Sequence, residues 1–283
     1  MAIAADTPAW LTVQRRDAPL IVSFPHTGTE IPPEIEARCV SSWLARKDAD
    51  WWIDQLYDFV REVGATTIRT AISRTVIDVN RDPSGVSLYP GQSTTGLVPT
   101  TTFDGEPLWR AGEVPGESEI ADRRRSYFEP YHAALANEIA RLRDEHPRIV
   151  LYDCHSIRSI IPRLFPGELP TMNIGTNSGA ACDMDLAEPI TAIASASRFS
   201  AVVDGRFKGG YITRRYGTPE RGVHAVQMEL ACRGYLREPI GPVDEGNWPV
   251  PYDAGYAAEI RGVLRSILET CLRFAGEGNA RHP

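Results

Sequence analysis

The 283-residue chain lacks the features that would place it in a membrane or on a nucleic acid. No apolar run approaches the roughly 20 residues that a transmembrane helix needs. Residues 1–6 have neither the basic segment nor the long apolar core of a secretory signal. The net charge is -7 and no basic stripe is present, so nucleic acid is not an expected partner. These absences predict a cytoplasmic protein that does not act on a membrane.

Cysteine is scarce, and its spacing shows no motif. The five cysteines are an odd number, are widely separated and form no Cys-x-x-Cys. Reduced thiols in a cytosolic protein therefore fit best. Cys154 stands beside His155, which raises the hypothesis of a nucleophilic thiol. A small strand residue pointing into the core is the more common use of such a cysteine.

No internal repeat or low-complexity linker divides the chain, and 42% hydrophobic residues suffice for a sizeable core. We therefore expect one catalytic domain over residues 1–283. Hydrophobic periodicity predicts strands at 19–24, 66–71, 75–79, 148–152, 200–203 and 223–230. It predicts helices opening at 32 and spanning 48–63, 119–145 (interrupted at Pro130), 185–196 and 253–274. Strands that alternate with helices indicate an α/β fold with a central mixed, mostly parallel sheet flanked by helices. The Gly- and Pro-rich segments 82–118, 157–185 and 205–217 read as loops, and 82–118 is long enough for a lid.

Two apolar runs each lead to a histidine. Leu20–Phe24 is followed by His26, and Ile149–Tyr152 by His155. Ligands of open α/β sheets bind outside the carboxyl ends of the strands, and a neutral imidazole there can bind a divalent metal. Asp153 shares the side of the strand on which His155 lies, so it is expected to orient that imidazole.

A catalytic zinc site usually has three protein ligands and one open position. Asp48, Asp50 and Glu30 are the candidates for the third ligand. An aspartate at a helix start is also expected as a cap, which accounts for one of the two aspartates. Asp50 is preferred because it adjoins Trp51 at the boundary with the apolar face.

The densest polar motif runs from Ser73 to Arg81. If 75–79 is a strand, Arg74 and Asp78 share one face, either as a surface ion pair or as part of an anion-binding wall. Guanidinium grips a carboxylate through two parallel hydrogen bonds, and Asn80 can add an amide donor. The loop around Gly209-Gly210 carries further arginines, namely Arg206, Arg214 and Arg215.

Glu229 lies among apolar residues near the end of the last predicted strand. A carboxylate in such a place is either paired structurally or is an acid/base group with a raised pKa. Next to a metal-bound water, it could accept the proton of that water and pass it to a leaving nitrogen.

In combination, these segments resemble the N-formylglutamate amidohydrolase (deformylase) family of histidine degradation. The resemblance runs from about residue 10 to 272. The motifs that carry it are Pro25-His26-Thr27-Gly28, Asp48-Ala49-Asp50-Trp51, Ser73-Arg74 through Asn80-Arg81, Asp153 through Arg158, Gly205 through Thr213 and Gln227-Met228-Glu229-Leu230. The stretch from Ser156 to Pro170 looks like the deformylase branch of that family.

The resemblance implies a phosphorylase/hydrolase-like fold similar to zinc carboxypeptidases and a metal-dependent amidohydrolase that cleaves N-formyl-L-glutamate to glutamate and formate. It implies one divalent metal, zinc by preference, bound by His26, His155 and an acidic residue, with Glu229 as general base. Thr29 stands where the carboxypeptidase pattern has a glutamate, which leaves the acidic ligand open between Asp50, Asp48 and Glu30. The substrate is a small dicarboxylate, for which the expected ligands are Arg74, Asn80, Arg81, Arg206 and Arg215. A monomer and a homodimer are both compatible with the sequence.

Three other functions are compatible with the same residues. One is a deacylase for another acidic N-acyl amino acid or a γ-glutamyl substrate. A second is a cysteine hydrolase that pairs Cys154 with His155 or His224, although adjacent strand residues point to opposite faces. The third is a protein that binds glutamate-like anions without turning them over.

Overall fold

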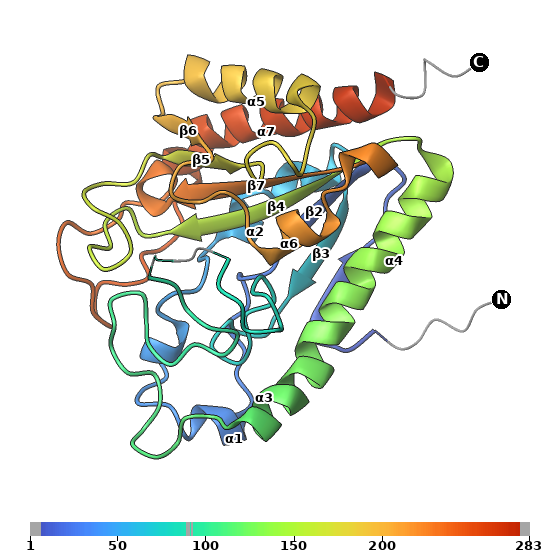
Figure 1. Cartoon of the computed structure of the whole chain (residues 1–283). Coiled ribbons are helices and arrows are strands. Elements are labelled where there is room, and N and C mark those ends of the chain that lie inside the picture. The colour runs from blue at the N-terminus through green and yellow to red at the C-terminus, as the bar shows by residue number, and fades with distance from the viewer. Residues whose placement is uncertain (1–6, 89–90, 92, 278–283) are drawn as a thin grey trace.

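Seven strands form one mixed sheet in the computed structural model, which describes residues 7–88, 91 and 93–277 (Figure 1). The strands are β1 (Leu11–Gln14), β2 (Leu20–Phe24), β3 (Thr66–Thr70), β4 (Ile149–Ile157), β5 (Met172–Gly175), β6 (Ala201–Val203) and β7 (Val223–Ala231). Their order is β1-β3-β2-β4-β7-β5-β6. Only β1–β3 and β5–β7 pair antiparallel in this sheet, so the predicted mixed, mostly parallel sheet is confirmed. Two predictions concern residues outside the described ranges: the absence of a secretory signal at residues 1–6, and the chain ends 1 and 283 as the limits of the domain.

Helices cover both faces of the sheet. The α-helices of the described residues are α1 (Pro33–Glu36), α2 (Ile53–Leu56), α3 (Glu117–Arg123), α4 (Glu129–Glu145), α5 (Met184–Ala196), α6 (Tyr211–Tyr216) and α7 (Ala254–Glu277). A π-helical turn at Arg124–Phe128 joins α3 to α4, so the interruption predicted at Pro130 lies one turn earlier, and Pro130 occupies the first turn of α4. None of the helices in the described ranges is both long and apolar enough to cross a bilayer.

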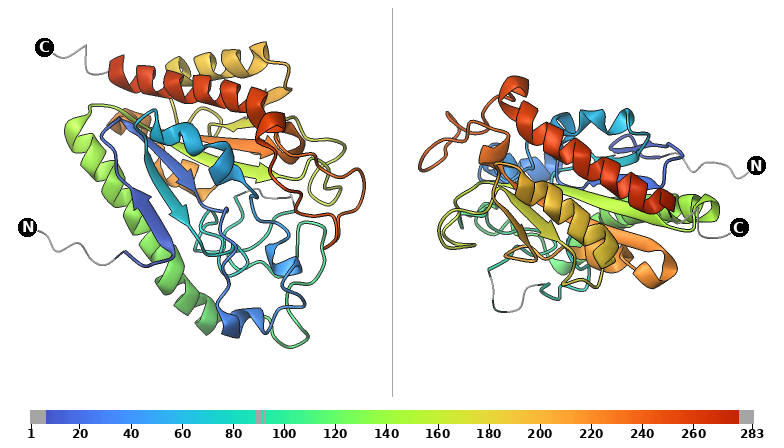
Figure 2. Two further views of the ribbon diagram at one scale, coloured as in Figure 1. Left: turned by 180° about the vertical axis from the view of Figure 1, so that it is seen from behind. Right: turned by 90° about the horizontal axis from the view of Figure 1, so that it is seen from above.

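The alternation of β4 divides the core into two layers. Val150, Tyr152 and Cys154 pack with α2, α5 and α7 on one face. Ile149 and Leu151 pack with α4 and α6 on the other. Seen from above, α5 and α7 lie together over one face of the sheet (Figure 2). With both faces covered, all nine residues of β4 and all nine of β7 are buried, which explains why apolar residues occur on both faces of each strand.

The segment 75–79 is not a strand, contrary to the sequence prediction. The chain turns there, because Val76 N donates to Ser73 O and Asn80 N donates to the Asp78 side chain. Arg74 and Asp78 meet across this turn at 2.6 Å, and the pair is buried rather than on the surface. The polar contacts within the turn determine its conformation. The β-branched residues indicate only that these side chains would fit on a pleated sheet.

Other boundaries also differ from the prediction. The expected helix 48–63 is reduced to α2 and a 3-10 turn at Asp58–Arg61, because Trp52 has a positive φ of 63° that breaks the helical path. The expected loops 157–185 and 205–217 contain β5 and α6, and β1 was not expected. These elements are four to six residues long, too short for periodicity to separate them from loops.

His132 links α4 to the polar turn and should make stability depend on pH. Its Nε2 lies 2.8 Å from Val79 O, its Nδ1 lies 3.0 Å from the Tyr216 hydroxyl, and burial lowers its pKa to about 4. The unfolded chain takes up the proton near pH 6.5, so stability is full above that pH and falls as the pH drops towards 4. At pH 5 the loss from this group should be about 2 kcal/mol. Denaturant unfolding of wild type and His132→Gln at pH 7 and 5 measures it, and identical pH slopes would contradict the assignment.

Candidate metal centre and active-site pocket

Three buried side chains converge near the carboxyl ends of β2 and β4. His26 follows β2 and His155 belongs to β4, and their Nδ1 atoms lie 3.1 Å apart. Asp50 Oδ2 lies 3.2 Å from His155 Nδ1 and 3.7 Å from His26 Nδ1. Asp50 is placed there by its backbone N–H, which donates to His26 O at 3.0 Å. The three residues form a group whose ligand atoms could hold one metal ion.

The far nitrogen of each imidazole faces a carboxylate. His26 Nε2 lies 2.7 Å from Asp78 Oδ1, and His155 Nε2 lies 2.8 Å from Asp153 Oδ2. An ionised carboxylate only accepts hydrogen bonds, so both Nε2 atoms carry a proton, and each imidazole in its neutral form presents the lone pair of Nδ1. Two lone pairs and a carboxylate oxygen that converge within 4 Å repel one another unless a cation lies between them. The donor set therefore fits a divalent metal, and the Asp78 and Asp153 contacts are those that orient metal-binding imidazoles.

Burial and the charges around the centre shift the pKa values of the two histidines in opposite directions. Burial, followed by the charge of Arg74, lowers the pKa of His26. Burial also opposes a charge on His155, but the carboxylates of Asp153 and Asp50 outweigh it and raise the pKa of His155 well above its ordinary value. The carboxylates therefore favour positive charge at this centre.

Neither of the other acidic candidates reaches the two imidazoles. Asp48 turns towards the loop, where its Oδ2 accepts a 2.6 Å hydrogen bond from Phe103 N, and burial raises its pKa to about 6. Glu30 is exposed and lines a separate surface depression beside Pro32. Of the three acidic residues, only Asp50 lies at the centre, as preferred from the sequence.

Glu229 stands directly across from His155 in the β4–β7 register. Its carboxyl group is buried, and burial raises its pKa to about 7. Gln227 Nε2 donates to Glu229 Oε2 at 3.0 Å, while Gln227 Oε1 accepts from Gly210 N at 2.7 Å. A carboxyl group with a pKa near neutrality beside a potential metal site is suited to proton transfer.

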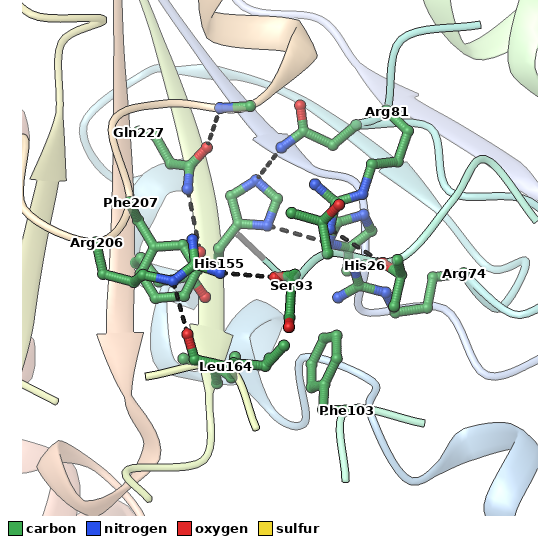
Figure 3. Close-up of a pocket in the computed structure, with 16 residues that line it drawn as sticks. His26, Arg74, Arg81, Ser93, Phe103, His155, Leu164, Arg206, Phe207 and Gln227 are labelled. Atoms are coloured by element: carbon green, nitrogen blue, oxygen red, sulfur yellow. Dashed lines mark hydrogen bonds between the residues drawn. The ribbon is translucent and has the colours of Figure 1, made fainter. Parts of the chain in front are cut away.

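One pocket opens onto this centre (Figure 3). Its empty space, including the mouth, is about 560 Å³. Besides the two imidazoles and Glu229, its wall includes Arg74, Asn80, Arg81, Ser93, Thr95, Phe103, Leu164, Arg206 and Gln227. Ser93, Thr94, Thr95 and Phe103 belong to the segment 82–118. This position at the pocket is the one that a lid, as suggested by the sequence, would occupy.

Three of the expected substrate arginines lie at the pocket. Arg74 is buried, pairs with Asp78 and packs its guanidinium 4.8 Å from the Phe103 ring centroid. Arg81 Nη2 donates to Thr95 Oγ1 at 3.0 Å. Arg206 donates to Leu164 O and Ser93 O, and so joins two loops at the mouth. Together they add three guanidinium groups to the lining of the pocket, with Arg206 on the side opposite Arg74 and Arg81 (Figure 3).

The other two expected ligands are placed differently. Arg215 is exposed on α6, stacks near Tyr216 and is not part of the pocket wall, because the loop expected at 205–217 forms a helix that directs it outward. Asn80 is at the wall, but its amide contacts Ile212 N, Asp153 and His155.

The sequence left three contributions unassigned. Asp78 was expected to pair only with Arg74, yet it also binds His26. Gln227 received no role, although it shares a strand face with Glu229 two residues on, and that period-2 spacing was the available signal. Phe103 gave no signal, because its position depends on how a long loop folds back.

Cys154 is not part of the pocket. It packs into the α5–α7 side of the core, 0% exposed, and burial raises the pKa of its thiol well above the ordinary value. His155 points to the opposite face of β4, and His224 packs against Phe274. A cysteine–histidine pair is therefore absent among these three residues.

Comparison with known proteins gives matches over most of the chain. The model of the N-formylglutamate amidohydrolase family matches residues 18–236. N-formylglutamate deformylases of Pseudomonas aeruginosa and Pseudomonas putida are 44% and 42% identical to the chain. These alignments cover 94% and 92% of the chain, and 97% and 94% of the two relatives.

Two solved structures share the fold. The N-formylglutamate amidohydrolase of Ralstonia eutropha JMP134 aligns with a TM-score of 0.75 at 22% identity, covering 96% of this chain and 99% of that one. A gene product of Agrobacterium tumefaciens aligns with a TM-score of 0.68 at 18% identity, covering 93% and 94%. At these identities the structures support the architecture alone.

Proposed function

The chain belongs to the N-formylglutamate amidohydrolase family, and we propose that it hydrolyses N-formyl-L-glutamate to L-glutamate and formate. The observation that carries the proposal is the juxtaposition of a potential metal site, His26–Asp50–His155, with the buried carboxyl of Glu229. The names of the two Pseudomonas relatives support the choice of substrate. Breakdown of histidine is the metabolic context that fits this reaction.

His26 Nδ1, His155 Nδ1 and Asp50 Oδ2 would hold one divalent cation. Zn²⁺ is the proposed metal, because two imidazoles, one carboxylate and an open position are a common catalytic zinc set. When bound, it would supply Lewis acidity that activates water and polarises the formyl carbonyl. Asp78 and Asp153 would keep the two imidazoles in the tautomer that leaves Nδ1 unprotonated.

Glu229 is the proposed general base and acid. Its carboxylate would accept the proton of the attacking water, and the same group would then protonate the departing amine nitrogen. Gln227 holds one carboxylate oxygen, Oε2, at 3.0 Å, which fixes the orientation of the group. Placement of the base in β7 rather than in a loop restricts its movement relative to His155.

The carboxylates of N-formylglutamate would be bound by the guanidinium groups of Arg74, Arg81 and Arg206, which line the pocket from two sides. Two negative charges on a small substrate require such cations in a protein of net charge -7. A planar guanidinium can bind a carboxylate through two hydrogen bonds. Arg215 is not proposed as a ligand, because it lies outside the pocket wall.

Steady-state kinetics test the substrate assignment. N-formyl-L-glutamate should be hydrolysed with a higher kcat/KM than N-acetyl-L-glutamate or a γ-glutamyl dipeptide. Pretreatment with a chelator should abolish turnover, and Zn²⁺ should restore it. A higher kcat/KM for one of the other substrates would contradict the formyl specificity and favour a different acidic acyl amino acid.

Cys154→Ala should retain activity. The thiol faces the core and not the pocket, so kcat/KM should stay within about twofold of wild type. The smaller side chain should lower the free energy of unfolding by about 1 kcal/mol, since it leaves unfilled space beside Tyr57 and Tyr152. Formate release and urea unfolding measure the two effects. Loss of turnover in a folded Cys154→Ala protein would instead support the cysteine hydrolase.

A further inference from the structure

Asn80 has both polar atoms of its side chain engaged by the protein. Its Oδ1 accepts a 2.8 Å hydrogen bond from Ile212 N, which fixes the orientation of the amide. The Nδ2 group then donates to Asp153 Oδ2 at 3.3 Å, beside the His155 Nε2–H that donates to the same oxygen. Asn80 therefore contacts the support of the metal centre, although it also lines the pocket.

Asp153 depends on this amide. Its carboxylate is 0% exposed, and within the described part of the chain its Oδ1 accepts no hydrogen bond. The two donors that approach it, His155 Nε2–H and Asn80 Nδ2–H, converge on Oδ2. A buried carboxylate with few donors is costly. Loss of the Asn80 amide would leave Asp153 with His155 alone and weaken the contact that fixes the imidazole.

The backbone of Asn80 and the neighbouring loop also hold this residue at the metal centre. Its N–H donates to Asp78 Oδ1 at 2.9 Å, so this residue also supports the carboxylate that orients His26. A Cβ at Gly210 would lie 2.4 Å from Asn80 Nδ2. Only glycine allows the loop to approach the amide this closely, and the approach clamps Asn80 between α6 and β4.

We propose that Asn80 is a positioning residue of the metal centre rather than a ligand of the substrate. Its side chain holds Asp153, Asp153 holds the His155 imidazole, and the imidazole is thereby kept in the orientation that binds metal. The inference rests on the proposed function, because it requires a metal at His26, Asp50 and His155. It deepens that function by assigning Asn80 to the support of the metal ligands and leaving substrate binding to the arginines of the pocket.

The test is the zinc affinity of the metal-free protein, measured by competition with a chromophoric chelator. Asn80→Ala should bind Zn²⁺ about 10- to 100-fold more weakly than wild type. With zinc at saturation, its KM for N-formyl-L-glutamate should remain within about twofold of wild type while kcat falls. Asn80→Ser loses the amide but leaves a polar group in the same space, so it should show the same loss of zinc affinity. It replaces Asn80→Ala in the test if the alanine variant does not fold.

Asn173→Ala is the matched control. Asn173 is also a fully buried amide, but within the described residues its Nδ2 donates to backbone atoms alone, Pro170 O and Glu229 O. Its replacement should leave zinc affinity unchanged. Equal losses of affinity in the Asn80 and Asn173 variants would overturn the proposal as general destabilisation. Unchanged zinc affinity with a raised KM in Asn80→Ala would overturn it in favour of substrate binding. The zinc titration needs no substrate, so it tests Asn80 even if N-formyl-L-glutamate proves not to be turned over.

Discussion

Glu229→Gln should lower kcat by about 10²- to 10⁴-fold, the usual contribution of a positioned acid/base group. The amide has nearly the same shape as the carboxyl, and its oxygen can still accept the hydrogen bond from Gln227. Binding should therefore change little, and the Kd of N-formyl-L-glutamate should stay within about threefold. Stopped-flow or quenched turnover gives kcat, and calorimetric titration of the variant gives Kd.

Glu30→Gln is the control for this substitution. Glu30 is exposed and outside the pocket, so its variant should match wild type in kcat and Kd. Full turnover by Glu229→Gln would remove the proposed base from the reaction. A variant that loses binding together with turnover would indicate a substrate contact instead. If Glu229→Gln still binds N-formyl-L-glutamate but no longer turns it over, the hypothesis of a non-catalytic anion-binding protein is also excluded.

Asp50→Asn should weaken zinc binding by more than about 100-fold. This exceeds the loss expected when a hydrogen-bond partner of a ligand is removed rather than a ligand itself. The neutral amide keeps the size of the side chain but removes the charge that would face the metal. Activity at limiting zinc should fall in parallel. Metal analysis after dialysis, together with chelator competition, measures the loss.

Asp48→Asn is its matched control. Asp48 is two residues away and also largely enclosed, but its Oδ2 accepts from Phe103 N, which an amide oxygen can also do. Zinc affinity should be unchanged in that variant. If Asp48→Asn loses zinc and Asp50→Asn does not, the ligand assignment is wrong.

The two histidines were predictable because each follows an apolar strand. His26 and His155 needed only the rule that ligands gather at the carboxyl ends of parallel strands, and the adjacency of β2 and β4 brings their Nδ1 atoms to 3.1 Å. Glu229 was predictable for a different reason, as a carboxylate between the apolar residues Met228 and Leu230. Asp50 was favoured but not decided, because a left-handed residue at Trp52 and a hydrogen bond to His26 O place it.

The polar turn at 73–81 was not predictable from its pattern. Alternating β-branched residues suggested a strand with Arg74 and Asp78 on one face. The structure instead folds the chain so that Asp78 meets His26, a contact over 52 residues. Long-range contacts of this kind do not appear in local periodicity. Arg215 was misplaced for a related reason, since α6 directs it away from the pocket.

The most direct test of the metal centre is a crystal structure of the zinc-loaded protein with data collected at the zinc absorption edge. One anomalous peak should lie about 2.0–2.2 Å from His26 Nδ1, His155 Nδ1 and an Asp50 oxygen, with one position open towards Glu229. A peak bound by Asp48 or Glu30, or zinc-loaded crystals with no peak between the two imidazoles, would contradict the account.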